Sequence, residues 1–390
     1  MNISNHNQSI KWISAICLWL FVCFAPRPCD AQYGRGQIET QYLTDLDYFP
    51  DGKQIAMSGD KIRIVDVASK EVVQTTTPNS RINVLRCSPV DVTVFAVGSK
   101  DGAISIYEVG KQKPRRTFRA ETKPTIGINS LAWSPDGKYL ASSGIAFSKG
   151  VVGKGACSVW DAATGKQLFA LDYDDIGCRA VAFSPDGSLL AVSLNPNDSS
   201  SSILLVTTDN WKEQRRIPFS PGFALDIAFT PDSRQLIAVG GFCKETANGC
   251  RPTGRIWHTQ LAASEPPTMF VPTAESQYFS GVAPLTNDRF FVVGENYDRG
   301  LRRHVEMWSA ATGEKLWARR GGGGGAGMAV RISPDDETVA YLDKGRHGYQ
   351  LITISVSGSP RNANPTTLFE LPYNRILAPR EPMQLSEQAK

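Results

Sequence analysis

One pattern of apolar and polar residues recurs along most of the chain: an apolar strand, a turn of the type Ser-Pro-Asp-Gly, and a second apolar strand. The stretch WSPDGKYLASS shows it in full. Proline suits the first central position of a turn, and aspartate and glycine suit the next two, so the pattern predicts a β-hairpin. Seven copies, some with a lost turn, lie at 48–58, 87–97, 133–143, 183–193, 229–239, 283–293 and 332–342.

A second phrase follows most of these hairpins: an alternating strand, a short polar or glycine-containing turn, and another strand. It reads SVWDAATGKQLFAL at 158–171 and EMWSAATGEKLWA at 306–318. Each repeat therefore carries four short strands, and no helical period separates them. One four-stranded sheet cannot bury both faces, whereas seven sheets packed in a ring can. The sequence predicts an all-β fold, a seven-bladed β-propeller of four-stranded antiparallel blades.

The repeats divide the chain into three parts. Residues 32–371 are predicted to form the propeller as one domain, because the period shows no break. Residues 372–390 contain three prolines and are predicted to form an irregular C-terminal tail. Two ways of closing the ring remain open. The last blade takes its outer strand either from 366–371 or from 36–42 at the other end of the chain.

Residues 1–31 differ from the repeats. Lys11 precedes an apolar run over 12–25, and small residues lead up to Ala31. This order is typical of a secretory signal peptide, here cleaved near Ala31. It predicts a secreted or periplasmic protein without membrane attachment after cleavage. An uncleaved membrane anchor is the alternative, although the run is shorter than the roughly 20 apolar residues that span a bilayer.

The cysteines outside the predicted signal peptide are odd in number. They are Cys87, Cys157, Cys178, Cys243 and Cys250. Cys243 and Cys250 bracket a short polar loop, and an oxidising compartment favours a disulfide between them. A metal half-site with His258 as a third ligand is the alternative. Cys157 and Cys178 are a second possible pair, whose separation the sequence does not reveal.

Two motifs carry a family resemblance. Trp160-Asp161, followed by Thr164-Gly165, matches a signature dipeptide and its turn. The loop VGSKDG at 97–102 places Asp101 where a turn-bracing aspartate is expected. On these residues the chain resembles the WD-repeat β-propeller family over about 36–371. The resemblance implies a rigid platform for protein–protein contacts in a family that rarely contains enzymes.

The chain also departs from the WD pattern. Trp257 and Trp308 stand at the signature tryptophan, but His258 and Ser309 replace the aspartate that follows it. The Gly-His pair that opens a family repeat is absent. The hydrogen-bond network of the family is therefore expected to be incomplete here.

Charge is unevenly distributed along the chain. The net charge is only +4, which gives no reason to expect nucleic-acid binding. Basic residues gather instead in loops predicted for blades five to seven, where ten of them accompany four acids, a balance of +6. The ten are Lys244, Arg251, Arg255, Arg299, Arg302, Arg303, Arg319, Arg320, Lys344 and Arg346.

The loops that carry these basic residues are expected on one face of a propeller. Arginine presents a planar fork of donors that suits carboxylates and phosphates. We therefore predict that this face binds an anionic partner, which is an acidic protein surface, a glycan or a phosphate group. An ordinary solvated loop surface is the alternative.

Motifs for catalysis and cofactors are missing. The three histidines outside 1–31 form no metal spacing, and no Gly-x-Ser-x-Gly elbow occurs. The glycine run 321–325 precedes an expected strand, not the helix that a dinucleotide site needs. Asp172, Asp174 and Asp175 suggest a solvated loop more than a calcium site. The inner-strand ends are expected to lack paired carboxylates.

We therefore predict no catalytic, cofactor or metal site. The predicted function is that of a non-catalytic, secreted scaffold that binds a protein through its propeller loops, without nucleic-acid partners. The alternatives are a propeller enzyme, a lyase or hydrolase using the central channel, or a binder of anionic envelope glycans.

Overall fold

The structure is a computed structural model of the whole chain. It describes residues 37–39, 42–120, 125–148, 151–196, 200–246, 249–263, 266–270, 277–296, 302–323, 329–344, 348–356, 365–372 and 375–377. The predicted signal peptide, residues 1–31, lies outside them. The described part contains strands and no helix, and accordingly none long and apolar enough to cross a membrane.

Twenty-eight strands form seven four-stranded sheets, each built from consecutive strands. Blade 1 holds β2 (Leu43–Tyr48), β3 (Gln54–Gly59), β4 (Ile62–Asp66) and β5 (Val72–Thr76). Blade 2 holds β6 (Ile82–Cys87), β7 (Val94–Ser99), β8 (Ala103–Glu108) and β9 (Arg116–Arg119). Blade 3 holds β10 (Gly127–Trp133), β11 (Tyr139–Ser148), β12 (Val151–Asp161) and β13 (Gln167–Asp174). Blade 4 holds β14 (Ile176–Phe183), β15 (Leu189–Pro196), β16 (Ser202–Thr207) and β17 (Glu213–Pro218).

The remaining blades follow the same order. Blade 5 holds β18 (Phe223–Phe229), β19 (Gln235–Thr246), β20 (Gly249–Gln260) and β21 (Thr268–Phe270). Blade 6 holds β22 (Gln277–Pro284), β23 (Arg289–Asn296), β24 (Arg302–Ser309) and β25 (Lys315–Gly323). Blade 7 holds β26 (Val330–Ile332), β27 (Thr338–Lys344), β28 (Gly348–Ser355) and β29 (Thr366–Pro372).

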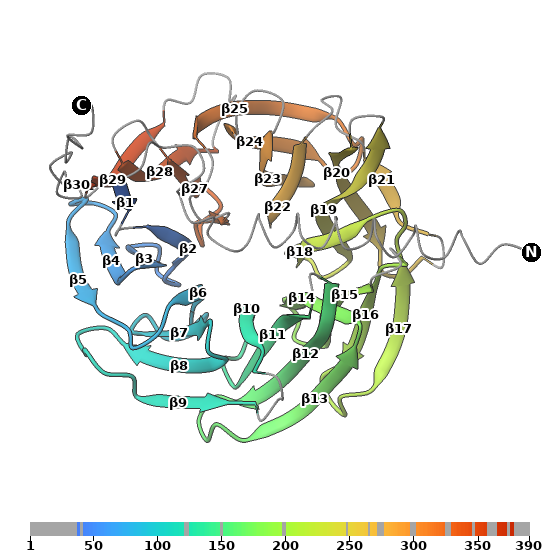
Figure 1. Cartoon of the computed structure of the whole chain (residues 1–390), viewed down its shortest axis with the longest axis horizontal. Coiled ribbons are helices and arrows are strands. Elements are labelled where there is room, and N and C mark those ends of the chain that lie inside the picture. The colour runs from blue at the N-terminus through green and yellow to red at the C-terminus, as the bar shows by residue number, and fades with distance from the viewer. Residues whose placement is uncertain are drawn as a thin grey trace, which may run out of the picture.

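The seven sheets stand around a common axis, with the first strand of each blade innermost (Figure 1). Neighbouring strands within each blade are antiparallel. The predicted seven-bladed propeller of four-stranded blades is therefore confirmed. Blade 7 takes its outer strand from β29, the first of the two closures left open by the sequence.

The two ends of the ring also meet outside the blades. Strand β1 (Gln37–Glu39) pairs with β30 (Arg375–Leu377) as a separate two-stranded sheet beside blades 7 and 1 (Figure 1). Both β30 and the last residue of β29 lie in the segment for which an irregular tail was expected. Part of that segment therefore has regular structure.

Side-chain packing closes the seam between blade 1 and blade 7. Leu46 and Met57 of blade 1 share one buried apolar cluster with Leu342 and Leu351 of blade 7. The Tyr48 hydroxyl lies 3.0 Å from the Thr338 hydroxyl across the same seam. No strand of one blade is exchanged with the other among the described residues, so side-chain packing contributes to closing the ring at this seam.

The recurrent turn between first and second strands has a local cause. In blade 3 the Ser134 hydroxyl donates to Asp136 Oδ1 at 2.7 Å and accepts from the Tyr139 amide at 2.8 Å. Gly137 then adopts φ +70°, a conformation that glycine reaches without steric cost. Each Ser-Pro-Asp-Gly turn therefore satisfies its own polar groups.

Degenerate turns keep the same backbone and gain a further contact. Ser233 and Asp336 replace the glycine in blades 5 and 7, and both have φ 61°. The Ser233 hydroxyl accepts from the Asp186 amide of blade 4 at 2.9 Å. The Asp336 carboxylate accepts from the Thr286 amide of blade 6 at 2.8 Å. These substitutions link neighbouring blades on the face that carries the turns, which we call the turn face.

Candidate interaction site

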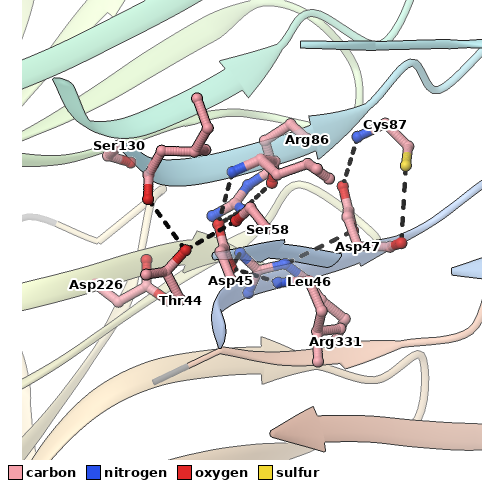
Figure 2. A network of polar contacts seen from close by, with 12 residues as sticks. Thr44, Asp45, Leu46, Asp47, Ser58, Arg86, Cys87, Ser130, Asp226 and Arg331 are labelled. Carbon is pink, nitrogen blue, oxygen red and sulfur yellow. Dashed lines mark hydrogen bonds and ion pairs between the residues drawn. The ribbon is translucent and has the colours of Figure 1, made fainter. Parts of the chain in front are cut away.

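Charged side chains on the innermost strands form one network (Figure 2). Arg86 of β6 donates to Asp45 of β2 at 2.6 Å. Arg331 of β26 lies 3.6 Å from both Asp45 and Asp47. Together with Asp226 of β18 they form what we call the inner-ring network. Its ion pairs join blades 7, 1 and 2, and electrostatic attraction to Arg331 and Arg86 couples Asp226 of blade 5 to them. The network corrects the expectation that inner-strand ends lack paired carboxylates.

The carboxylates of this network also hold backbone amides. Asp45 accepts from the Leu46 amide of its own strand and from the Leu85 amide of blade 2, both at 3.0 Å. Asp226 makes the equivalent pair of bonds in blade 5, to Ile227 within its strand and across to blade 6. Both aspartates therefore fasten one blade to the next, which is a structural role.

Burial dominates the electrostatics of the network. It raises the pKa of both Asp47 and Asp226, although Arg331 and Arg86 attract their charged forms. Acids with raised pKa values often mark catalytic sites. Here, however, Asp47 already accepts from the Tyr48 and Cys87 amides at 3.1 and 3.0 Å. The carboxylates of the network are therefore already engaged by backbone amides and arginines of the protein itself.

Sequence reasoning missed the inner-ring network although a signal existed. Asp45 and Asp47 alternate on an inner strand where blade 4 has Ala180 and Ala182. A charged pair at positions that blade 4 fills with alanine indicates a special contact. Its partners, however, come from two different blades and are visible only once the ring is closed.

The face opposite the turns carries a projecting hairpin. Because strands alternate in direction, the second-to-third strand connections and the links between blades emerge at one end of the ring, which we call the loop face. In blade 5, β19 and β20 pair as far as Thr246 and Gly249. The outer limits of their neighbours lie closer to the turns: β18 begins opposite Gly241, and β21 pairs no further than Ile256. Residues 242–246 and 249–253, which we call the hairpin arm, therefore extend beyond their sheet.

The structure places the predicted basic residues toward the loop face but spreads them over three blades. Lys244 pairs with Arg251 inside the hairpin arm. The loop-face ends of β20, β24, β25 and β27 carry Arg255, Arg302, Arg303, Arg319, Arg320 and Lys344. Arg299 and Arg346 lie outside the described residues, as do the side chains of Lys244, Arg251, Arg302 and Arg303.

The four basic side chains that are described have different surroundings. Arg320 is exposed, and Arg319 is half-buried. The Lys344 ammonium lies 5.4 Å from the centre of the Tyr349 ring. Arg255 departs most from expectation. It is not a solvated loop residue, because it belongs to β20 and only 9% of it is exposed.

The predicted disulfide lies in the hairpin arm. Cys243 is paired in register with Pro252, and Cys250 with Glu245. The side chains of both cysteines lie outside the described residues, so the disulfide stays a prediction. The other possible pair, Cys157 and Cys178, consists of buried free thiols.

Metal ligation finds no support in the described part of the chain. His258, the third ligand of the alternative half-site, has Nε2 2.7 Å from the Gln235 side-chain oxygen. Burial lowers the pKa of His258, so the imidazole is neutral. Among the described residues no three His, Cys, Asp or Glu side chains gather as a metal site would require. Asp172 instead pairs with Lys154 at 2.9 Å.

The signature tryptophans differ in their hydrogen bonds. Trp160 Nε1 donates to the Ser142 hydroxyl at 3.0 Å, and Asp161 accepts from the Thr164 amide and hydroxyl, both at 2.7 Å. Trp257 Nε1 is buried without an acceptor among the described residues. Blade 3 is thus closest to the WD pattern, and blade 5 is incomplete.

Comparison with known proteins agrees with this assignment. The family model described as "WD domain, G-beta repeat" matches residues 112–161, which include Trp160 and Asp161. This match and the seven-bladed fold together support a WD-repeat β-propeller family for the chain. Two WD-family relatives are similar in sequence. Protein HIR1 of Yarrowia lipolytica is 27% identical over 32% of this chain and 12% of that protein. The chromatin assembly factor 1 subunit FAS2 homolog of Oryza sativa subsp. japonica is 22% identical over 53% of this chain and 48% of that protein.

The matched part of this chain spans about half or less of the length of each of these curated relatives. Their similarity indicates a scaffold for protein–protein interaction. Among solved structures, a chain of Kuenenia stuttgartiensis hydrazine synthase is similar with a TM-score of 0.65 at 15% identity, over 87% of this chain and 98% of that one. At that identity the likeness concerns the fold alone.

Proposed function

We propose that this WD-repeat protein is an exported, non-catalytic scaffold that binds an acidic protein partner through the loop face of blades 5 to 7. One observation carries the proposal. The hairpin arm projects from this face, and all of the predicted basic residues that the structure describes lie toward the same face. Projecting loops on a rigid framework are where binding concentrates.

Charge supports the choice of partner. The ten basic residues exceed the nearby acids by six, more than the net charge of the chain. An excess of positive charge attracts anionic surfaces and speeds their association at low ionic strength. The non-catalytic part of the proposal is supported by the inner-ring carboxylates, which are already engaged by backbone amides and guanidinium groups. Export is proposed from the composition of residues 1–31.

The test is affinity capture with the mature chain from the extracellular or periplasmic fraction of the native organism, repeated over a salt series. We expect one acidic protein to be retained at low salt and released as salt screens the contact. A variant with Arg302, Arg303, Arg319 and Arg320 replaced by Gln should lose it. Arg234→Gln, an exposed arginine on the turn face of blade 5, is the matched control and should retain it.

Three outcomes contradict the proposal. Retention of the captured protein that does not change with ionic strength argues against an anionic partner. Equal loss in the Arg234→Gln control argues against the loop face. Retention of an anionic glycan without any protein favours the envelope-binding alternative. Export is tested separately, by sequencing the N-terminus of the native protein, which we expect to begin shortly after Ala31.

A further inference from the structure

We propose that the loop-face end of the seam between blades 4 and 5 is a carboxylate-binding site in which Arg255 receives an acidic side chain of the partner. The inference rests on the proposed function, because it names the residue that would bind the acidic partner. We call this place the seam site. It comprises Ser201, Phe242, Arg255 and Trp257.

Arg255 is a buried cation without a counter-charge among the described residues. Its guanidinium carbon lies 4.6 Å from the centre of the Phe242 ring, and Nη1 donates to the Gly254 carbonyl at 2.8 Å. Its buried Nε has no acceptor, and no carboxylate among the described residues pairs with it. Burial lowers the pKa of Arg255, but a guanidinium stays protonated in proteins. A buried charge left unpaired is costly, so a ligand that supplies the counter-charge is favoured.

The groups beside Arg255 are also hydrogen-bond donors. Trp257 follows two residues later on the same side of β20, and its Nε1 has no acceptor. The Ser201 hydroxyl is buried and likewise has no partner in the described part of the chain. An indole N–H and a guanidinium can only donate, so the missing group must accept hydrogen bonds.

Contacts across the seam bring Ser201 and Trp257 together. The Phe219 amide donates to the Ser201 carbonyl at 3.0 Å, and the Phe219 ring lies 4.8 Å from that of Trp257. Ser200 is bridged to Gly222, and a Cβ at Gly222 would lie 3.0 Å from the Trp257 ring. The two donors therefore belong to one neighbourhood, with Arg255 above Trp257 toward the hairpin arm.

The donor set favours a carboxylate over a phosphate. A guanidinium binds a carboxylate through two parallel N–H···O bonds, and neutral donors complete the contact. The seam site offers one described cation, which balances the single charge of an aspartate or glutamate. A phosphate carries more charge and usually gathers more cationic groups around it.

The experiment titrates the ¹⁵N-labelled mature chain with a capped octaglutamate peptide and follows the indole N–H resonance of Trp257. Trp257→Phe identifies that resonance. We expect octaglutamate to shift it, capped octaglutamine to leave it in place, and Arg255→Gln to weaken binding at least about tenfold. Arg234→Gln removes an exposed arginine from the turn face and should leave octaglutamate binding unchanged. Arg255→Lys keeps the charge without the fork and should fall between them, which also covers a poorly folded Arg255→Gln.

The outcomes separate this inference from the proposed function. Octaglutamate binding that spares Trp257 and weakens with Arg320→Gln but not with Arg255→Gln overturns the seam site and leaves the loop face as the binding surface. An equal Trp257 shift with inorganic phosphate overturns the choice of a carboxylate. Absence of octaglutamate binding overturns the seam site. The loop-face proposal then stands or falls by the capture experiment.

Discussion

Two largely buried arginines, Arg86 in blade 2 and Arg255 in blade 5, have opposite electrostatic surroundings in the same ring. The Arg86 side chain is 19% exposed and lies 2.6 Å from Asp45. Arg255 is 9% exposed and pairs with no carboxylate among the described residues. The fold supplies the acceptors of Arg86, whereas no described residue supplies an acceptor for Nε of Arg255.

The pKa values of the two guanidinium groups shift in opposite directions. Burial alone would lower the pKa of Arg86, but attraction to Asp45, Asp47 and Asp226 outweighs it, so the pKa is raised. Burial lowers the pKa of Arg255, with nothing to oppose it. A paired buried charge of this kind orders the blades. An unpaired one is the feature expected where a partner completes the site.

The sharpest way to break this comparison is to replace each arginine with methionine. Arg86→Met leaves buried aspartates without their main partner and should lower the free energy of unfolding by about 3–5 kcal/mol. Arg255→Met removes an unpaired cation at the cost of its stacking on Phe242. Its free energy of unfolding should therefore stay within about 1 kcal/mol of the wild type. Urea unfolding at neutral pH measures both.

A double variant gives the control. Adding Asp45→Asn to Arg86→Met removes part of the unbalanced charge, so the two effects should be less than additive. If Arg86→Met and Arg255→Met lower stability equally, the distinction between paired and unpaired arginines is wrong.

A second, smaller contrast concerns the signature tryptophans. Trp160→Phe and Trp257→Phe remove the same atoms from two buried sites, but only Trp160 loses a hydrogen bond, that to Ser142. We expect Trp160→Phe to lower the free energy of unfolding by about 1 kcal/mol more than Trp257→Phe. Equal losses in urea unfolding would mean that Trp257 has an acceptor in solution, such as an ordered water, and would weaken the seam site.

The fold was predictable because its cause is local. The turn built on Ser134, Asp136 and Gly137 satisfies its own polar groups, and seven repeats of it determine the number of blades. Ring closure was left open because it depends on contacts between distant residues. The hydroxyls of Tyr48 and Thr338, for example, meet across 290 positions. The same holds for the pairing of β1 with β30.

The candidate site was predictable only at the level of a face. Loop positions and strand direction are enough to place basic residues such as Arg320 on the loop face. Arg255 packs against Phe242 in the hairpin arm, and Trp257 beside it packs against Phe219 of blade 4, contacts that have no sequence signature. The inner-ring pairing of Asp45 with Arg86 likewise needs the neighbouring blade.

The smallest expected effect concerns the turn face, where carboxylates are satisfied within the chain. Hydrogen bonds from the Thr164 hydroxyl and amide lower the pKa of Asp161, and the Thr230 hydroxyl does the same for Asp232. The unfolded chain lacks these bonds and binds protons at higher pH. Their contribution is therefore complete above the unfolded pKa near 4 and is lost as the pH falls through the folded pKa.

Replacing Asp161 and Asp232 together with Asn should accordingly reduce the loss of stability between pH 7 and pH 3, by less than about 1 kcal/mol per site, because Asp161 is only partly buried and Asp232 is exposed. Urea unfolding at the two pH values measures it, and an equal loss in variant and wild type would contradict the assignment. Asp226 opposes this trend, since burial raises its pKa and its charge costs stability at neutral pH, a cost that disappears on acidification. A reduced acid sensitivity in the double variant would therefore mean that the internally satisfied turn-face carboxylates contribute to the loss of stability in acid.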